Sequence, residues 1–292
     1  MQRIVPNIWF DHTAAEAATF YTSIFPGSRV VDTQHYPTEG LPDFQADMAG
    51  QVLMVELEVA GYRLMGINAG PQFPLNPSMS FILNFDPSAD PQAREHLDEL
   101  WAALSDGGQV LMPLQEYPFS LHYGWVKDRY GVSWQLMLTN PQGEPRPFLT
   151  PSLMFGSTAQ GRAAEAIELY TSLFAGKTGT MARYPDGPAA GQLMYADFQM
   201  ADQWFAAMDA AGQDFTFNPG ESLMLACADQ AEIDHYWERL SAVPEAEQCG
   251  WCADQFGLSW QIVPAAMGEL MTKPGAYAKL MGMKKIDIAA FG

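Results

Sequence analysis

Residues 124–135 read GWVKDRYGVSWQ, and residues 250–261 read GWCADQFGLSWQ. The Gly-Trp, Asp, Gly and Ser-Trp-Gln elements of this stretch recur at identical spacing. Residues 16–25 (EAATFYTSIF) likewise match residues 165–174 (EAIELYTSLF), and Asn76-Pro77 matches Asn218-Pro219 in the same order. Ordered self-similarity of this kind indicates an internal duplication. We therefore predict two copies of one half-length domain, joined head to tail.

The domain boundaries follow from the duplication and from a proline-rich stretch. A chain of 292 residues suits two ordinary domains, and residues 140–151 have the composition of a linker. We predict one domain over residues 1–143, a second over residues 147–266, and a basic helical tail over residues 267–292. The tail could dock on the body of its own chain or on a second chain, or simply pack as a helix over the sheet.

Each copy is predicted to be α+β, with a strand, a helix and three strands, twice over. A capping box at Thr13–Glu16 should start the first helix, and Asp90-Pro91 should open the second. Ala60-Gly61 is expected to be a tight hairpin turn. The strands expected in copy one cover residues 4–10, 29–36, 51–59, 62–68, 80–86, 109–113, 121–127 and 132–138.

Composition and charge exclude several classes of protein. The formal net charge of −19 opposes binding to nucleic acid. The sequence contains no apolar run that would span a membrane and no apolar signal region at its start, so we expect a cytosolic protein. Three cysteines do not form a disulfide framework. Cys249 and Cys252 have CxxC spacing, but we expect them in a strand over residues 248–253, which is not typical of a redox or zinc motif.

The unit order and the repeated motif resemble the vicinal oxygen chelate superfamily, which includes glyoxalase I, bleomycin-resistance proteins and extradiol dioxygenases. The closer resemblance is to its PhnB-like branch, often labelled 3-demethylubiquinone 3-methyltransferase. It rests on Trp9-Phe10, Asn76-Pro77, Ser80-Phe81, residues 249–251 and the ending at residues 281–288. The resemblance implies tandem βαβββ units that form two glyoxalase-like domains with curved mixed sheets around a cavity. In relatives that cavity lies between two copies, so the fused chain would act as a pseudo-dimer.

The resemblance also locates the positions that hold a divalent metal in superfamily enzymes. They fall near Pro6 and Pro151, at Met65 or Gly66 and at Ala206 or Ala207, at Ser80 and Ser222, and at Gln135 and Gln261. Only the glutamines could coordinate a metal, and one neutral oxygen does not hold a divalent ion against water. We therefore expect no metal and no cofactor, with a site unique to copy one through His122 or His35 left open.

The same positions define a candidate ligand site. Strand alternation places Trp134 on one face of residues 132–138 and Gln135 on the other. We expect the Trp134 face to lie under the helices and Gln135 and Gln261 to point into the cavity, unless they merely bond a neighbouring strand. The candidate ligand-binding residues are Gln135, Gln261, Ser80, Ser222, Trp125 and Trp251, although core packing is slightly favoured for the last two.

Four functions remain as alternatives. The first is a metal-free protein that binds a small, partly apolar molecule between curved sheets. The second is a metal-dependent enzyme of glyoxalase or dioxygenase type. The third is the methyltransferase of the family label, disfavoured because the sequence has no glycine-rich strand-to-helix turn for a nucleotide-like cofactor. The fourth is a structural or interaction role. No catalytic residue is assigned, and catalysis and further homodimerisation stay open.

Overall fold

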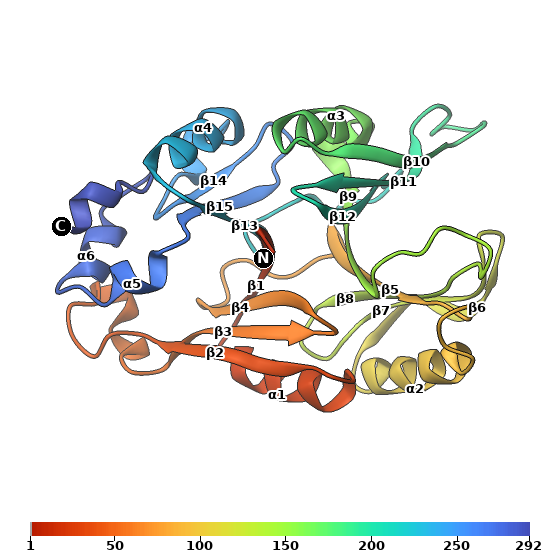
Figure 1. Ribbon diagram of the computed structural model, residues 1–292, viewed down its shortest axis with the longest axis horizontal. Helices are drawn as coiled ribbons and strands as arrows, with labels where there is room; N and C mark the ends of the chain where they lie inside the picture. The colour runs from red at the N-terminus through yellow and green to blue at the C-terminus, as the bar shows by residue number, and fades with distance from the viewer. Residues whose placement is uncertain (1) are drawn as a thin grey trace.

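The computed structural model describes residues 2–292 and contains two mixed β-sheets with helices packed on them (Figure 1). Seven-stranded sheet A has the order β14-β15-β13-β1-β4-β3-β2, and eight-stranded sheet B has the order β10-β11-β12-β9-β5-β8-β7-β6. Sheet A therefore joins the first unit of copy one to the last unit of copy two, while sheet B joins the two middle units. The chain has the predicted α+β class.

The strands have the following bounds. Sheet A contains β1 (Ile4–Phe10), β2 (Arg29–His35), β3 (Val52–Val59), β4 (Tyr62–Asn68), β13 (Glu221–Cys227), β14 (Trp251–Ala253) and β15 (Ser259–Pro264). Sheet B contains β5 (Met79–Phe85), β6 (Gln109–Tyr117), β7 (Ser120–Lys127), β8 (Ser133–Leu138), β9 (Leu149–Phe155), β10 (Lys177–Arg183), β11 (Leu193–Met200) and β12 (Gln203–Asp209). In copy one the predicted strands agree with these to within about two residues, except that β6 runs four residues longer.

Helices cover one face of each sheet. Figure 1 shows α1 (Ala14–Ile24) and α2 (Ala93–Ser105) on one side of the molecule, and α3 (Ala163–Leu173) and α4 (Gln230–Leu240) on the opposite side. Both sheets curve away from their helices, which leaves each with a concave face. The tail forms α5 (Met267–Met271), α6 (Ala276–Met281) and a final 3₁₀ turn, η4 (Ile288–Phe291).

The prediction of four identical units is wrong for the last unit. Helix α4 is followed by only two strands, because the 3₁₀ turn η3 (Pro244–Ala246) stands where the other units have an edge strand. Sheet A consequently ends at the short strand β14, and residues of the tail reach this end of the sheet.

Both predicted helix caps are also wrong in detail. Helix α1 follows Thr13 as expected, but the Thr13 side chain makes no capping bond; the backbone N–H of Ala14 instead donates to Asn68 Oδ1 at 2.9 Å. Asp90 accepts from the Gln92 N–H, and the helix begins only at Ala93. A tertiary partner can satisfy a free N–H at a helix start as well as a local cap does. The Ala60-Gly61 turn does form, with positive φ at both residues.

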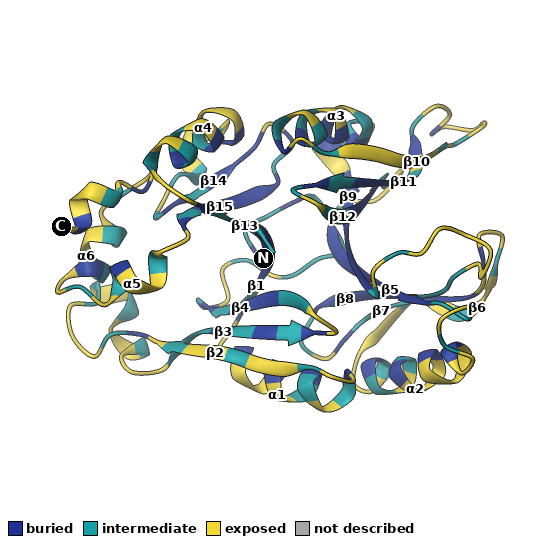
Figure 2. Ribbon diagram, in the orientation of Figure 1, coloured by how far each residue is buried: buried dark blue, intermediate teal, exposed yellow. Residues whose placement is uncertain are grey.

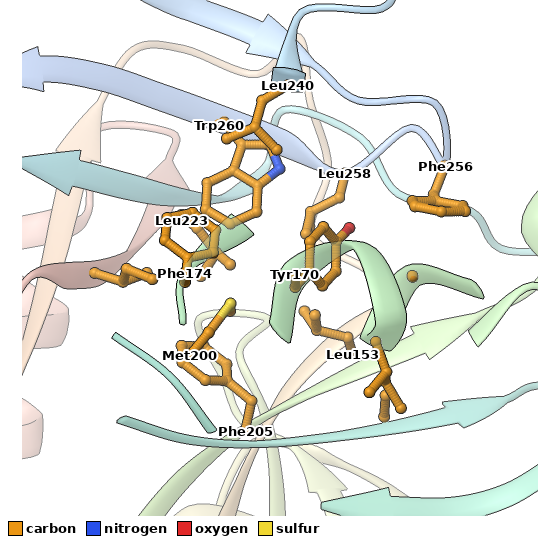
Figure 3. Packing of buried hydrophobic residues seen from close by; sticks show 14 of the residues in the cluster. Leu153, Tyr170, Phe174, Met200, Phe205, Leu223, Leu240, Phe256, Leu258 and Trp260 are labelled. Atoms are coloured by element: carbon orange, nitrogen blue, oxygen red, sulfur yellow. The ribbon is translucent and has the colours of Figure 1, made fainter. Parts of the chain in front are cut away.

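Each copy has its own hydrophobic core between helices and sheets. Trp134 is fully buried in the core of copy one and Trp260 in that of copy two, as Figure 3 shows for the second. In Figure 2 the central strands are buried along most of their length, whereas the helices bury one side. The predicted placement of Trp134 beneath the helices is confirmed. No helix among residues 2–292 is both long and apolar enough to cross a bilayer.

A buried carboxylate accepts hydrogen bonds from several residues in the core of each copy. Asp128 accepts hydrogen bonds from Tyr21 Oη (2.7 Å) and Trp134 Nε1 (2.8 Å), and from the backbone N–H groups of Tyr130 and Val132. Burial raises the pKa of the Asp128 carboxyl, and these four donors partly offset that rise. Copy two repeats the arrangement around Asp254, with donors from Tyr170, Trp260, Phe256 and Leu258. The aspartate of the repeated motif is thus a structural residue in both copies.

A third buried carboxylate, Glu221 at the start of β13, predicts a pH dependence. One of its oxygens, Oε1, has no hydrogen-bond partner, and desolvation raises its pKa well above the usual value. A raised folded-state pKa means that stability is present below the unfolded pKa and is lost as pH rises through the folded one. We expect Glu221→Gln to match the parent at pH 4 and to exceed it in stability by about 1–3 kcal/mol at pH 8. Urea unfolding at both pH values measures this, with exposed Glu39→Gln as control; a pH-independent difference would contradict it.

Candidate functional site

A row of polar side chains crosses the concave face of sheet A. Asn7 on β1 pairs in register with Ser222 on β13 and with Met65 on β4. Gln261 Nε2 on β15 donates to Ser222 Oγ at 2.9 Å. Four positions that correspond to superfamily metal positions therefore lie side by side, two from each copy.

The concave face of sheet B carries the equivalent row. Ser152 on β9 pairs with Ser80 on β5 and with Ala206 on β12. Gln135 Nε2 donates to Ser80 Oγ at 2.7 Å, and its Oε1 accepts from Tyr123 Oη at 2.7 Å. The structure thus joins each predicted glutamine to its predicted serine and orients both onto a concave face. Each glutamine also bonds a neighbouring strand, as the alternative interpretation predicted, because its partner serine lies on that strand.

The first-strand positions expected near Pro6 and Pro151 need a correction of one residue. Side chains of a strand alternate between faces, and Pro6 shares its side with Ile8, which belongs to the core under the helices. Asn7 and Ser152 occupy the concave faces instead. The same alternation selects Met65 and Ala206 from the paired alternatives: a Cβ on Gly66 would lie 2.9 Å from the Phe10 ring on the core side.

Three polar atoms in the two rows have no hydrogen-bond partner. Asn7 is only 1% exposed, and neither its Nδ2 nor its Oδ1 is bonded; Ser152 is fully buried, and its Oγ is also unbonded. A buried polar group without a partner costs about 1–3 kcal/mol. Asn7 and Ser152 are equivalent positions of the two copies, so both rows have free hydrogen-bonding capacity in the same place.

Aromatic side chains flank both rows. Trp251 lies opposite Gln261 in the strand register, and its ring packs edge-on against Trp9 at 5.9 Å between centroids. Trp125 lies opposite Gln135 and donates through Nε1 to Ser133 Oγ at 2.8 Å. Both predicted tryptophans are therefore half-buried on the concave faces and lie outside the cores.

Sheet B has a further aromatic cluster that the sequence interpretation missed. Tyr117, Phe119 and Tyr123 contact one another around the β6–β7 hairpin, with centroid distances of 5.0–5.6 Å. Burial raises the pKa of Tyr123, so it stays a phenol that donates to Gln135. Its spacing of two residues from Trp125 places both on one face of β7 and could have identified it. Asn7 carried no such signal, because a single asparagine in an apolar strand fits either face.

A protein-family model matches most of the chain, in two segments. The family model described as 3-demethylubiquinone-9 3-methyltransferase matches residues 2–137 and again residues 147–263. The chain belongs to this family. It is a tandem member of it, and the two matched segments follow the duplication read from the sequence. No protein with a curated function matches the sequence significantly.

Solved structures place this family member in the glyoxalase fold. Glyoxalase I from Zea mays is 11% identical, with a TM-score of 0.54, over 93% of this chain and 97% of that one. The PhnB protein of Bacillus cereus is 34% identical and is covered completely, over 47% of this chain, with a TM-score of 0.41. Protein PA1353 of Pseudomonas aeruginosa is 26% identical and is covered to 98%, over 48% of this chain, with a TM-score of 0.39. The predicted glyoxalase-like fold and the resemblance to the PhnB-like family are confirmed.

The donor set of this family member does not fit the metal that the glyoxalase fold implies. The rows offer only amides, hydroxyls, Met65 and Ala206, whereas Mg²⁺, Zn²⁺ and Ni²⁺ sites are built from carboxylate, imidazole or thiolate ligands, of which the rows have none. Residues 2–292 contain no cluster of three or more His, Cys, Asp or Glu side chains arranged to hold a metal. His122 faces α2, where Asp98 and Arg94 bond it, and His35 is exposed at the end of β2.

The predicted strand position of the CxxC pair is wrong, but the spacing is still not typical of a redox or zinc motif. Strand β14 covers only Trp251–Ala253, and Cys249 lies in the preceding turn with φ = 52°. Cys252 is buried, Cys249 is half-buried, and both thiols are free. Burial raises the pKa of the Cys252 thiol to about 12, which opposes the thiolate form that redox and zinc chemistry require.

The rows are enclosed by protein. Gln135 is 3% exposed and Gln261 is 7% exposed. A hollow of about 460 Å³ lies elsewhere, between residues 158–162 and 254–257. A molecule that reaches either row must therefore displace covering side chains or a covering segment.

Proposed function

We propose that this member of the 3-demethylubiquinone-9 3-methyltransferase family binds a small, neutral, partly apolar molecule on its concave faces. The observation that carries the proposal is the pair of unbonded polar side chains, Asn7 and Ser152, at equivalent positions beside a glutamine–serine pair. Natural proteins rarely bury polar groups without partners unless a ligand or ordered water satisfies them. A ligand carbonyl or hydroxyl group is suited to these amides and hydroxyls.

The chemistry of the rows restricts the ligand class. An amide and a hydroxyl both donate and accept hydrogen bonds, so they recognise a neutral polar group without requiring a charge. Trp9 and Trp251 in sheet A, and Trp125 and Tyr123 in sheet B, offer flat apolar surfaces next to the rows. Aromatic surfaces with a few polar groups are typical of small-molecule sites. The neutral aromatic ketone prodan has both properties and fluoresces according to the polarity of its surroundings.

Two substitutions separate a binding role from a structural one. We expect Asn7→Leu and Ser152→Ala each to raise the stability of the free protein by about 1 kcal/mol, because an unbonded buried group is removed. The same changes should weaken prodan binding at their own face at least tenfold, about 1.4 kcal/mol. Urea unfolding and fluorescence titration measure the two effects.

Ser105 provides the matched control, because its Oγ is also buried without a partner but lies on α2, away from both faces. Ser105→Ala should raise stability similarly and leave prodan binding unchanged. A loss of stability in Asn7→Leu, together with unchanged binding, would show that Asn7 supports the fold through contacts of its own, and the proposal would fail.

The name of the family and the fold of its relatives define the competing outcomes. Calorimetry with S-adenosylmethionine tests methyl transfer, and near-stoichiometric binding that Asn7→Leu and Ser152→Ala leave intact would replace the proposal. Elemental analysis of the purified protein tests the metalloenzyme alternative, for which near-stoichiometric nickel, zinc, iron or manganese would be decisive.

A further inference from the structure

We propose that Asp197 and Trp204 form a cation-binding subsite on the concave face of sheet B, and that the chain's own Arg146 occupies it. Asp197 on β11 pairs in register with Ala206 on β12, and Ala206 pairs with Ser152 on β9. The subsite therefore lies at the β11 end of the polar row. It goes beyond the proposed function, because it depends on none of the unbonded atoms of the rows.

Arg146 belongs to the linker between the two copies, and its side chain lies against sheet B. Residues 141–145 are exposed, whereas the Arg146 side chain is 16% exposed. Its guanidinium carbon lies 4.0 Å from the centre of the Trp204 ring, and its Nε donates to Asp197 Oδ2 at 2.9 Å. Its Nη1 donates to the linker itself, at 3.2 Å from both the Glu144 carboxylate and the Pro145 carbonyl. A carboxylate beside an aromatic face is the arrangement that recognises a planar organic cation.

The neighbouring strand holds Asp197 in position for a cation. Asp197 is 5% exposed, and its Oδ1 accepts from the Thr180 N–H at 2.6 Å, so that Oδ2 faces the guanidinium. Gly179 on β10 permits this approach, because a Cβ there would overlap Asp197 Oδ1 and lie 3.1 Å from the Trp204 ring. The carboxylate is therefore oriented by the backbone, independently of Arg146.

Copy one has a different arrangement at the equivalent place. In the same strand register Glu56 stands for Asp197 and Arg63 stands for Trp204. Glu56 and Arg63 pair with each other at 2.8 Å. Sheet A thus neutralises its carboxylate within its own strands. Copy two has tryptophan in place of the arginine, so the partner of its carboxylate comes from outside the sheet.

This difference defines the class of ligand that fits the subsite. Withdrawal of Arg146 alone would leave Asp197 buried without a positive partner, which is strongly unfavourable. A ligand that brings an amidinium or guanidinium group replaces that partner, and an aromatic ring attached to the group keeps the contact with Trp204. Burial raises the pKa of nearby Tyr195, so this side chain stays a neutral phenol. The ligand class is therefore a planar aromatic cation.

Arg146→Ala makes the subsite testable with p-aminobenzamidine, a planar aromatic amidinium whose fluorescence rises in apolar surroundings. We expect this variant to bind the probe at least tenfold more tightly than the parent does, because the competing guanidinium is gone. Neutral p-aminobenzamide should bind neither protein. Adding Asp197→Asn or Trp204→Leu to Arg146→Ala should weaken binding of p-aminobenzamidine at least tenfold.

Arg129→Ala is the matched control. Arg129 also lies over an aromatic ring, that of Phe20 at 4.7 Å, and pairs with a carboxylate, but this carboxylate belongs to Asp106, whose side chain is 78% exposed. Removing Arg129 should therefore create no binding of p-aminobenzamidine. Equal binding by Arg129→Ala, or binding by Arg146→Ala that survives Asp197→Asn, would overturn the subsite and leave Arg146 as a residue that fastens the linker.

Two further outcomes are decisive. If Arg146→Ala does not fold alone, p-aminobenzamidine should restore its folding as followed by circular dichroism, and a lack of restoration would overturn the subsite. If prodan binds neither face while p-aminobenzamidine binds Arg146→Ala, the proposed function fails and the subsite stands. If prodan binds as expected and p-aminobenzamidine does not, the subsite fails and the proposed function stands.

Discussion

Replacing Asp254 with alanine is expected to lower the free energy of unfolding by about 3–5 kcal/mol. The carboxylate accepts four hydrogen bonds in the core of copy two, from Tyr170 Oη (2.6 Å), Trp260 Nε1 (3.0 Å) and two backbone N–H groups. Alanine leaves all four donors buried without partners. Each unpaired donor keeps much of its desolvation penalty, which is why the expected loss exceeds that of an ordinary surface change.

The matched substitution Asp128→Ala should cause a loss of similar size in copy one, because its donors are equivalent. Asparagine at either position should lose less, since its carbonyl oxygen can still accept the two backbone N–H groups. The midpoint of urea unfolding, followed by tryptophan fluorescence, measures all four variants. Exposed Asp214→Ala serves as control. A loss below 1 kcal/mol in both alanine variants would contradict a structural role for the repeated aspartate.

Alanine at either glycine of the repeated Gly-Trp pair is expected to destabilise the protein by about 1–3 kcal/mol, for two different reasons. A Cβ on Gly124 would lie 2.5 Å from the ring of Trp101, so the penalty comes from steric overlap. Gly250 has φ = 86°, a left-handed conformation that strains any other residue, and its Cβ would also meet Ile286 of the tail at 2.8 Å.

A second substitution distinguishes these causes. Trp101→Leu shortens the side chain, so the double variant Gly124→Ala/Trp101→Leu should be at least as stable as Trp101→Leu alone. Ile286→Val removes the 2.8 Å contact with Ile286 Cδ1 but leaves the 3.0 Å contact with the Ile262 carbonyl and the backbone strain, so Gly250→Ala should stay destabilising in that background. Double-mutant cycles by urea unfolding measure the coupling. Full rescue at Gly250 would show that contact with the tail, and not the positive φ, explains the glycine there.

Local sequence features predicted the elements well where neighbouring residues decide the outcome. The alternation around Trp134 and Gln135 correctly divided β8 between core and concave face, and Ala60-Gly61 correctly predicted a hairpin. The caps were mispredicted because Asn68, 54 residues from Ala14, supplies the partner that Thr13 was expected to provide. A capping bond from a distant strand leaves no pattern in the helix itself.

Only part of the candidate site was predicted, because the rest depends on residues that are distant in the sequence. Gln135, Gln261, Ser80 and Ser222 repeat between the copies, so self-comparison found them. Asn7 and Ser152 are chemically different and occupy equivalent positions only in the strand register. Their lack of hydrogen-bond partners depends on every neighbour that surrounds them, which the sequence does not display.

The sequence by itself determined the duplication, the α+β units, the resemblance to the PhnB-like family and the lack of histidine and carboxylate side chains at the expected metal positions, because these depend on residue identity and short-range periodicity. Tertiary structure alone decided that each sheet combines both copies, that η3 stands in place of an edge strand, and that residues of the tail bond the β14 end of sheet A. Those outcomes depend on which distant strands pair and which edges are left uncovered. The two copies of the motif therefore have different surroundings. Its first glycine, Gly124 in one copy and Gly250 in the other, is required for a different physical reason in each.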